Sequence, residues 1–129
     1  MLNQRVSILI VDDEPAIRSL LEHTLGPRYD CISVGSAEEA LRLMDAQVFH
    51  CALIDIGLPG MSGLTLCTMI VSRYPLTPVI TISGHTDDRS VADALQAGAL
   101  YHLTKPFNLS DVLLTVESAL KRHSPNAAA

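Results

Sequence analysis

Polar side chains follow four separate apolar segments of this 129-residue chain. Asp12-Asp13 and Asp55 supply three carboxylates, Ser83 supplies a hydroxyl and Lys105 an ammonium group. Three carboxylates brought close together repel one another and raise their pKa values, unless a divalent cation lies between them. An oxygen-only, partly hydrated site of this kind suits Mg²⁺. With the cation bound, one carboxylate would attack phosphorus, Lys105 would neutralise phosphoryl oxygens, and Ser83 would donate to the product.

The hydrophobic pattern predicts the strands that must bring these groups together. Near-continuous apolar runs are typical of parallel strands covered on both faces. Such runs occupy residues 6–11, 51–54 and 78–83, and weaker ones occupy 29–34 and 100–103.

Apolar residues at helical spacing predict a helix after each strand. These stripes cover residues 17–25, 37–44, 66–70, 91–98 and 109–120. Ser36 and Glu39 predict a capping box at the second helix. Asp87 or Asp88 would begin the fourth helix, and Asn108 or Ser110 the fifth.

Five strands alternating with five helices predict an α/β fold, an open parallel sheet that is doubly wound with helices on both faces. In such sheets ligands bind beyond the carboxyl ends of the strands. The topology directs these groups to one edge, because each lies at a strand end or directly after it: Asp12-Asp13, Asp55, Ser83 and Lys105. The alternation therefore predicts a single site.

Each motif also has an ordinary structural interpretation. "DDEP" is typical of a helix start, because proline is favoured in the first turn. "PGMSG" is typical of a plain turn, and Lys105 alone of a solvated surface lysine. His85 and His102 alone would be surface or packing residues. The coincidence of four polar groups at four strand ends favours the functional interpretation.

The composition narrows the class of protein. With 48% hydrophobic residues and 18% charged ones, the sequence is that of a globular domain. The net charge of −5, without a Lys/Arg cluster, argues against nucleic-acid binding by this segment. Three cysteines without C-x-x-C spacing suggest reduced thiols and a cytoplasmic protein. No apolar run is long enough for a membrane span.

Four motifs, "ILIVDDEP", "LIDIGLPGMSG", "VITISGH" and "LTKPF", occur in order at their expected strand ends. With them the chain resembles the receiver domain of two-component response regulators, from about Val6 to Leu120. The resemblance implies a chemotaxis-regulator-like, flavodoxin-like (βα)5 fold with strand order 2-1-3-4-5. Residues 1–123 would form this domain, and residues 124–129 a disordered tail or the start of a linker.

The resemblance also implies a phosphoryl site. Asp55 matches the phosphoacceptor. Asp12, Asp13, Asp55 and the backbone carbonyl of Gly57 match the protein ligands of Mg²⁺ (or Mn²⁺). The phosphoryl donor would be a phosphohistidine on a sensor histidine kinase or a phosphotransfer protein.

Three further residues match the switch that responds to the phosphoryl group. Ser83 matches the switch hydroxyl, and Lys105 the phosphoryl-binding lysine, whose bond to Pro106 would be cis. His102 matches the switch position that is usually Tyr or Phe, and its ring is expected to rotate. Tyr101 would point to the opposite face of its strand. His85, with Gly57, matches positions that tune phosphoryl lifetime.

Phosphorylation would then reshape the face formed by the fourth helix, fifth strand and fifth helix, controlling an output domain, a partner protein or a phosphorylation-dependent homodimer. The partner surface would include Val91, Ala94, Tyr101 and His102, with Lys121 nearby. The protein would not be an enzyme beyond phosphorylating and dephosphorylating itself.

Three other functions compete with this interpretation. A haloacid-dehalogenase-type phosphatase has D-x-D after its first strand, whereas Asp55-Ile56-Gly57 follows the third predicted strand and lacks the second Asp. A flavodoxin-type FMN binder needs a phosphate loop where this chain has the repelling "DDEP". A pseudo-receiver would act as an interaction module without phosphorylation.

Overall fold

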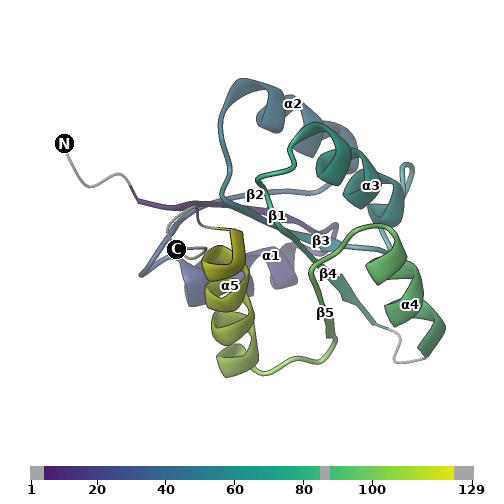
Figure 1. Cartoon of the computed structure of the whole chain (residues 1–129). Coiled ribbons are helices and arrows are strands. Elements are labelled where there is room, and N and C mark those ends of the chain that lie inside the picture. Colours follow the sequence, from purple (N-terminus) through teal and green to yellow (C-terminus); the bar gives the residue numbers. More distant parts are fainter. Residues whose placement is uncertain (1–4, 85–87, 124–129) are drawn as a thin grey trace.

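The computed structural model describes residues 5–84 and 88–123. Strands and helices alternate along the chain, as the sequence predicts (Figure 1). The strands are β1 Ser7–Val11, β2 Asp30–Val34, β3 Cys51–Asp55, β4 Val79–Ser83 and β5 Tyr101–Thr104. The helices are α1 Pro15–Leu25, α2 Ala37–Ala46, α3 Gly63–Arg73, α4 Asp88–Gln96 and α5 Leu109–His123. The predicted tail, 124–129, and Asp87 lie outside the described residues.

The five strands form one parallel sheet in the order β2-β1-β3-β4-β5, which confirms the predicted fold class and strand order. The register pairs Asp55 with Ile82 and Ser83 with Thr104. At the other side of β1, the Asp12 N–H donates to the carbonyl of Val34 at 3.1 Å. The last residues of β1, β3, β4 and β5 therefore meet at one edge of the sheet.

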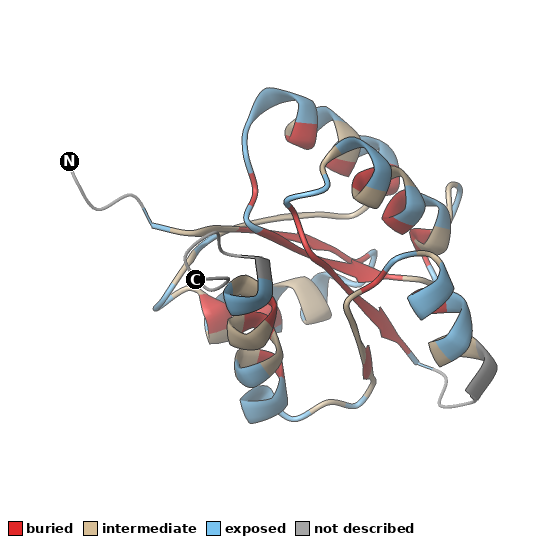
Figure 2. Cartoon of the chain, viewed as in Figure 1, coloured by how far each residue is buried: buried red, intermediate tan, exposed pale blue. Residues whose placement is uncertain are grey.

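Helices cover the sheet in two layers. α1 and α5 lie on one face, and α2, α3 and α4 lie on the other (Figure 1). Because side chains alternate along a strand, neighbouring residues of β1 enter different cores: Ile8 and Ile10 pack with α1 and α5, whereas Leu9 and Val11 pack on the opposite side. Figure 2 shows the buried residues concentrated in the central strands. This double burial is the reason for their continuous apolar runs.

Side-chain hydrogen bonds cap the N-termini of several helices. The Ser36 hydroxyl accepts from the Glu39 N–H at 3.2 Å, as in the predicted cap; the Glu39 carboxylate accepts from the same hydroxyl. Asn108 Oδ1 accepts from the Asp111 N–H at 2.8 Å, so Asn108, not Ser110, caps α5. The third helix begins at Gly63, three residues before its apolar stripe. Ser62 caps it, because the Ser62 hydroxyl accepts from the Thr65 N–H.

The prediction is wrong for one residue of the expected partner surface. Ala94 is fully buried in the core between the sheet and α3–α4, so it is no part of an exposed partner surface. On the same helix Leu95 is 50% exposed. The helical stripe already contained this information, because apolar residues at i and i+3 face the sheet.

The three cysteines are free thiols: Cys51 and Cys67 are buried and Cys31 is half-buried. Burial raises the pKa of Cys51 to about 12, so this thiol stays protonated and unreactive at neutral pH. Within the described ranges, no helix combines the length and apolar character needed to cross a membrane.

Candidate functional site

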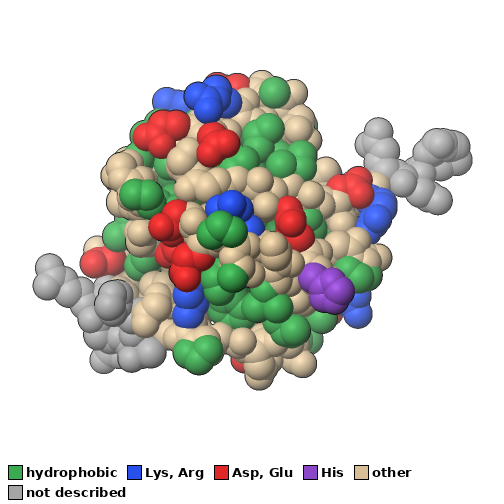
Figure 3. Space-filling model, turned by 180° about the vertical axis from the view of Figure 1, so that it is seen from behind, with side chains coloured by type: hydrophobic (Ala, Val, Ile, Leu, Met, Phe, Trp, Pro, Cys, Tyr) green, Lys and Arg blue, Asp and Glu red, His purple; other side chains and the backbone are tan. Residues whose placement is uncertain are grey.

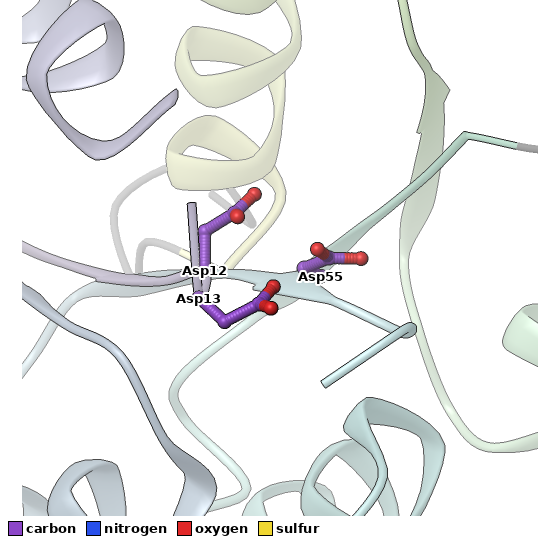
Figure 4. A group of neighbouring side chains, drawn as sticks. All are labelled: Asp12, Asp13 and Asp55. Atoms are coloured by element: carbon purple, nitrogen blue, oxygen red, sulfur yellow. The ribbon is translucent and has the colours of Figure 1, made fainter. Parts of the chain in front are cut away.

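Three aspartates converge where β1 and β3 end (Figure 4). Asp12 and Asp13 follow β1, and Asp55 is the last residue of β3. One carboxylate oxygen from each lies within 4.8 Å of the other two. Asp12 and Asp55 are buried, whereas Asp13 is exposed, and its side chain points toward Asp55 (Figure 4). The predicted cluster therefore forms, and it is open to solvent on the Asp13 side.

The Lys105 ammonium group lies among these carboxylates. Its Nζ is 3.2 Å from Asp12 Oδ2, 3.3 Å from Asp55 Oδ2 and 2.8 Å from Glu14 Oε1. Burial alone would lower the pKa of Lys105, but the hydrogen bond to Glu14 and the charges of Asp55 and Asp12 raise it above its ordinary value. Lys105 is therefore a firmly charged counter-ion, and not the solvated surface lysine of the ordinary interpretation.

The backbone at Lys105 is fixed in two ways. Its N–H donates to the carbonyl of Ser83 at 2.7 Å, which continues the β4–β5 ladder. Its bond to Pro106 is cis, as the resemblance implied. Beside this turn lies an apolar hollow formed with α1, lined by Ile17, Leu20, Lys105, Pro106 and Phe107.

Asp12 is the most constrained carboxylate of the cluster. Its Oδ1 accepts from the Glu14 N–H at 2.9 Å, and its backbone carbonyl accepts from Arg18 Nη1 at 2.6 Å. Its Oδ2 is buried, and among the described residues its partner is the Lys105 ammonium group at 3.2 Å, an ion pair that lacks hydrogen-bond geometry. Burial, followed by the nearby charge of Asp55, raises the pKa of Asp12, while the Glu14 N–H and Lys105 oppose this shift.

These features fit a divalent cation. The ammonium group of Lys105 supplies one positive charge to three neighbouring carboxylates, and the remaining negative charge favours a further cation between them. The donor set is entirely oxygen, which is the preference of Mg²⁺. The cluster thus offers Asp12, Asp13 and Asp55 as ligands; the part assigned to the Gly57 carbonyl stays a prediction.

Asp55 is positioned by the loop that follows it. Its Oδ1 accepts from the Gly57 N–H at 2.9 Å, leaving Oδ2 toward Lys105. A Cβ at Gly57 would lie 3.5 Å from Asp55 Oδ1, an ordinary contact. At Gly63, in contrast, a Cβ would lie 2.1 Å from the Asp55 carbonyl oxygen. The start of α3 therefore packs directly on the backbone of β3, and only glycine fits there.

Ser83, the last residue of β4, lies next to His102, the second residue of β5. Ser83 is 2% exposed, and its Oγ is 3.1 Å from His102 Nε2. The other ring nitrogen, Nδ1, is 2.7 Å from Thr81 Oγ1. Tyr101 packs into the opposite core, with α1 and α5, which confirms the predicted alternation. His85 lies outside the described residues.

Sequence reasoning missed Glu14 and Thr81. Glu14 was interpreted only as part of a helix start, yet its carboxylate is the nearest of the three that pair with the Lys105 ammonium group. The available signal was its place directly after Asp12-Asp13 at the sheet edge. Thr81 could have been found from strand alternation, because it lies two residues before Ser83 and therefore on the same face.

The surface carries no broad basic patch on the face drawn in Figure 3, where acidic groups lie beside the scattered Lys and Arg side chains. On this face, positive and negative side chains are therefore interspersed.

Comparisons with known proteins agree on one family. The family model of the response regulator receiver domain matches residues 8–117. Response regulator protein PilR of Pseudomonas aeruginosa is 42% identical over 124 residues, covering 95% of this chain and 28% of that protein. The transcriptional regulator NtrC of Escherichia coli is 35% identical, covering 93% and 26%. The chain thus spans about a quarter of the length of these curated relatives.

Solved structures give the same result. A CheY-like receiver domain protein from Methanospirillum hungatei superposes with a TM-score of 0.88 at 30% identity, covering 93% of this chain and 97% of that one. The BeF3-activated DrrB receiver domain superposes with a TM-score of 0.87 at 33% identity, covering 92% and 100%. The converging carboxylates, the parallel sheet and these matches lead to one conclusion: the chain belongs to the response regulator receiver domain family.

Proposed function

We propose that this receiver domain is a phosphorylation-driven switch in which Asp55 accepts a phosphoryl group from a phosphohistidine of a sensor kinase or phosphotransfer protein. The observation that carries the proposal is the position of Asp55. Its carboxylate ends β3 beside two further aspartates, with Lys105 Nζ 3.3 Å from Oδ2. A carboxylate in this setting has the charge to attack phosphorus and a cation to receive the phosphoryl oxygens.

In the proposed reaction, a carboxylate oxygen of Asp55 forms a bond to phosphorus while the P–N bond to the donor imidazole breaks. The Gly57 N–H holds Oδ1, so Oδ2 is the oxygen left to react. Lys105 neutralises the incoming phosphoryl oxygens. Asp12, Asp13, Asp55 and the Gly57 carbonyl would hold Mg²⁺, which supplies positive charge to the transferring group.

The response would spread through Ser83, the last residue of β4, and Lys105, which directly follows β5. Both are drawn toward the new oxygens, because the phosphoryl group adds about −1.5 to −2 charge at neutral pH. The surface that changes is then the α4–β5–α5 face, with Leu95 in place of the buried Ala94. We assign residues 1–123 to this domain and 124–129 to a tail or linker; an output domain, a partner protein or a second copy would read the change.

The decisive test is the intact mass of the wild type and of Asp55→Asn after incubation with Mg²⁺ and acetyl phosphate. We expect one phosphoryl group on the wild type, none on the variant, and none on the wild type when EDTA is present. Equal labelling of both proteins would place the acceptor elsewhere. A wild type that binds Mg²⁺ but gains no mass, even from a histidine kinase, would favour an interaction module.

Glu14 is expected to compete with the phosphoryl group for Lys105. Glu14→Gln removes one carboxylate from the ammonium group and from the surroundings of an incoming anion. An exposed ion pair contributes at most about 1 kcal/mol. We therefore expect beryllium fluoride, a mimic of the phosphoryl group, to bind the variant up to about fivefold more tightly than the wild type. Titration calorimetry with Mg²⁺ present measures this affinity.

A matched control for this change is Glu117→Gln, which removes the distant surface pair with Arg28 at 3.6 Å. The control is expected to leave the affinity unchanged. Weaker binding to Glu14→Gln than to the wild type would show that Glu14 holds Lys105 in a productive position, contrary to the prediction.

A further inference from the structure

His102 contacts two hydroxyl groups at once, one through each ring nitrogen. Thr81 Oγ1 lies 2.7 Å from Nδ1, and Ser83 Oγ lies 3.1 Å from Nε2. Burial lowers the pKa of His102, so the ring is neutral at neutral pH and carries one proton. A neutral imidazole donates from one nitrogen and accepts at the other. The position of that single proton therefore decides which hydroxyl must donate.

A second contact of Thr81 favours one of the two tautomers. Its hydroxyl also lies 3.5 Å from the carbonyl of Tyr101, which can only accept. Both Thr81 contacts are satisfied together when its proton points to that carbonyl and its lone pair accepts from Nδ1–H. Nε2 then has no proton, and the contact at 3.1 Å requires Ser83 to donate its hydroxyl proton to Nε2.

A phosphoryl group on Asp55 would require the opposite arrangement. A hydroxyl has one proton, so Ser83 cannot donate to Nε2 and to a phosphoryl oxygen together. If Ser83 turned its proton away, two lone pairs would face each other across the Ser83–His102 contact. The conflict ends when the ring proton exchanges from Nδ1 to Nε2 through solvent: Nε2–H then donates to Ser83, and Thr81 donates to Nδ1. The ring holds one proton in both states, and none is gained or lost overall.

We propose that His102 is a positioning residue whose tautomer changes with phosphorylation, orienting the Ser83 hydroxyl toward the phosphoryl group while Thr81 supports the second nitrogen. The inference rests on the proposed function of Asp55 and Ser83. It assigns His102 a role that a phenylalanine or tyrosine ring cannot perform, because such rings have no nitrogen to exchange a proton. The charged side chain described on the neighbouring helix α4, Asp93, is exposed and does not shift the pKa of His102.

The first test is long-range ¹H–¹⁵N spectroscopy of protein with ¹⁵N-labelled histidine at neutral pH. Without ligand, we expect Nδ1 of His102 to carry the proton; with Mg²⁺ and beryllium fluoride as a phosphoryl mimic, we expect Nε2 to carry it. His50 serves as the internal control, because its Nδ1 accepts from the Ser7 N–H at 3.0 Å, at the opposite edge of the sheet. Its resonances are expected to stay constant.

Three variants separate the two ends of the ring. His102→Phe removes both contacts, and we expect beryllium fluoride to bind roughly fivefold more weakly, the effect of one lost hydrogen bond. His102→Gln places an amide near the position of Nε2 and is expected to restore most of the affinity. His102→Asn places its amide near Nδ1 and is expected to behave like Phe. Urea unfolding of each variant identifies effects that arise from stability alone.

The outcomes separate a failure of the His102 tautomer change from a failure of the proposed phosphorylation of Asp55. If beryllium fluoride binds and Asp55 is labelled by acetyl phosphate, but the His102 tautomer does not change, the inference is overturned and the proposed function stands. Equal affinities of the Phe and Gln variants also overturn it. If the wild type neither binds the mimic nor is labelled on Asp55, both fail together.

Discussion

Gly63→Ala is expected to lower the free energy of unfolding by about 3 kcal/mol, the upper range for forcing extra volume into a packed site. The new Cβ would lie 2.1 Å from the Asp55 carbonyl oxygen and 2.5 Å from Ile56 Cα. Both are backbone atoms, so no side-chain rotation relieves the overlap, and either α3 or the end of β3 must move. Urea denaturation followed by circular dichroism measures the loss.

Gly84→Ala is the matched control, because a Cβ there meets no atom of the described residues within 4 Å. Its stability is expected to stay within about 0.5 kcal/mol of the wild type. The Gly63 variant is also expected to label poorly with acetyl phosphate, even at temperatures where it is fully folded, since Asp55 has been displaced. Wild-type stability and labelling in Gly63→Ala would refute the close packing of α3 on β3.

Asp12→Asn is expected to change stability in opposite directions with and without Mg²⁺. Burial raises the pKa of Asp12 above its ordinary 3.8 in the metal-free protein. The fold therefore favours the protonated form, and this contribution is present below pH 3.8 and lost as the pH rises through the folded-state pKa. At neutral pH, raising the folded-state pKa of Asp12 by one lowers the free energy of unfolding by about 1.4 kcal/mol. Asparagine removes the charge and keeps an acceptor for the Glu14 N–H.

In EDTA at neutral pH, Asp12→Asn should therefore be more stable than the wild type, and the difference should disappear in acid. Adding Mg²⁺ should stabilise the wild type in proportion to its binding and leave the variant nearly unchanged. Asp13→Asn is the control: this exposed residue should lose the Mg²⁺ response without gaining metal-free stability. An Asp12→Asn protein less stable than wild type in EDTA would mean that the ion pair with Lys105 outweighs burial.

The fold was predictable because its signals are local and repeated. Continuous apolar runs predicted the strands, and the position of polar residues at their ends predicted the site, since parallel strands share one carboxyl edge. The role of Glu14 was not predictable in this way, because its contact with Lys105 depends on the reach of two long side chains across 91 residues of sequence. Ala94, in contrast, was predictable: its place in the helical stripe already directed it toward the sheet, and the stripe was not applied to it.

The two hydrogen-bonding contacts of the His102 ring were not predictable from the sequence either. Sequence alternation places Thr81 and Ser83 on one face of β4, but only the β4–β5 register puts His102 opposite Thr81 and within reach of both. A shift of that register by one residue would turn the ring into the other core.

The long-range contacts of Lys105 also affect how the nascent chain assembles the site during translation. A chain emerging from the ribosome presents its N-terminal segments first. The carboxylates of β1 and β3 therefore appear well before the ammonium group that neutralises them, which lies 50 residues after Asp55. Until β5 joins the sheet, a nascent chain has a cluster of uncompensated negative charge and no complete acceptor site. We therefore expect the proposed acceptor site to be completed only when the chain has been made as far as Lys105 and β5 has joined the sheet.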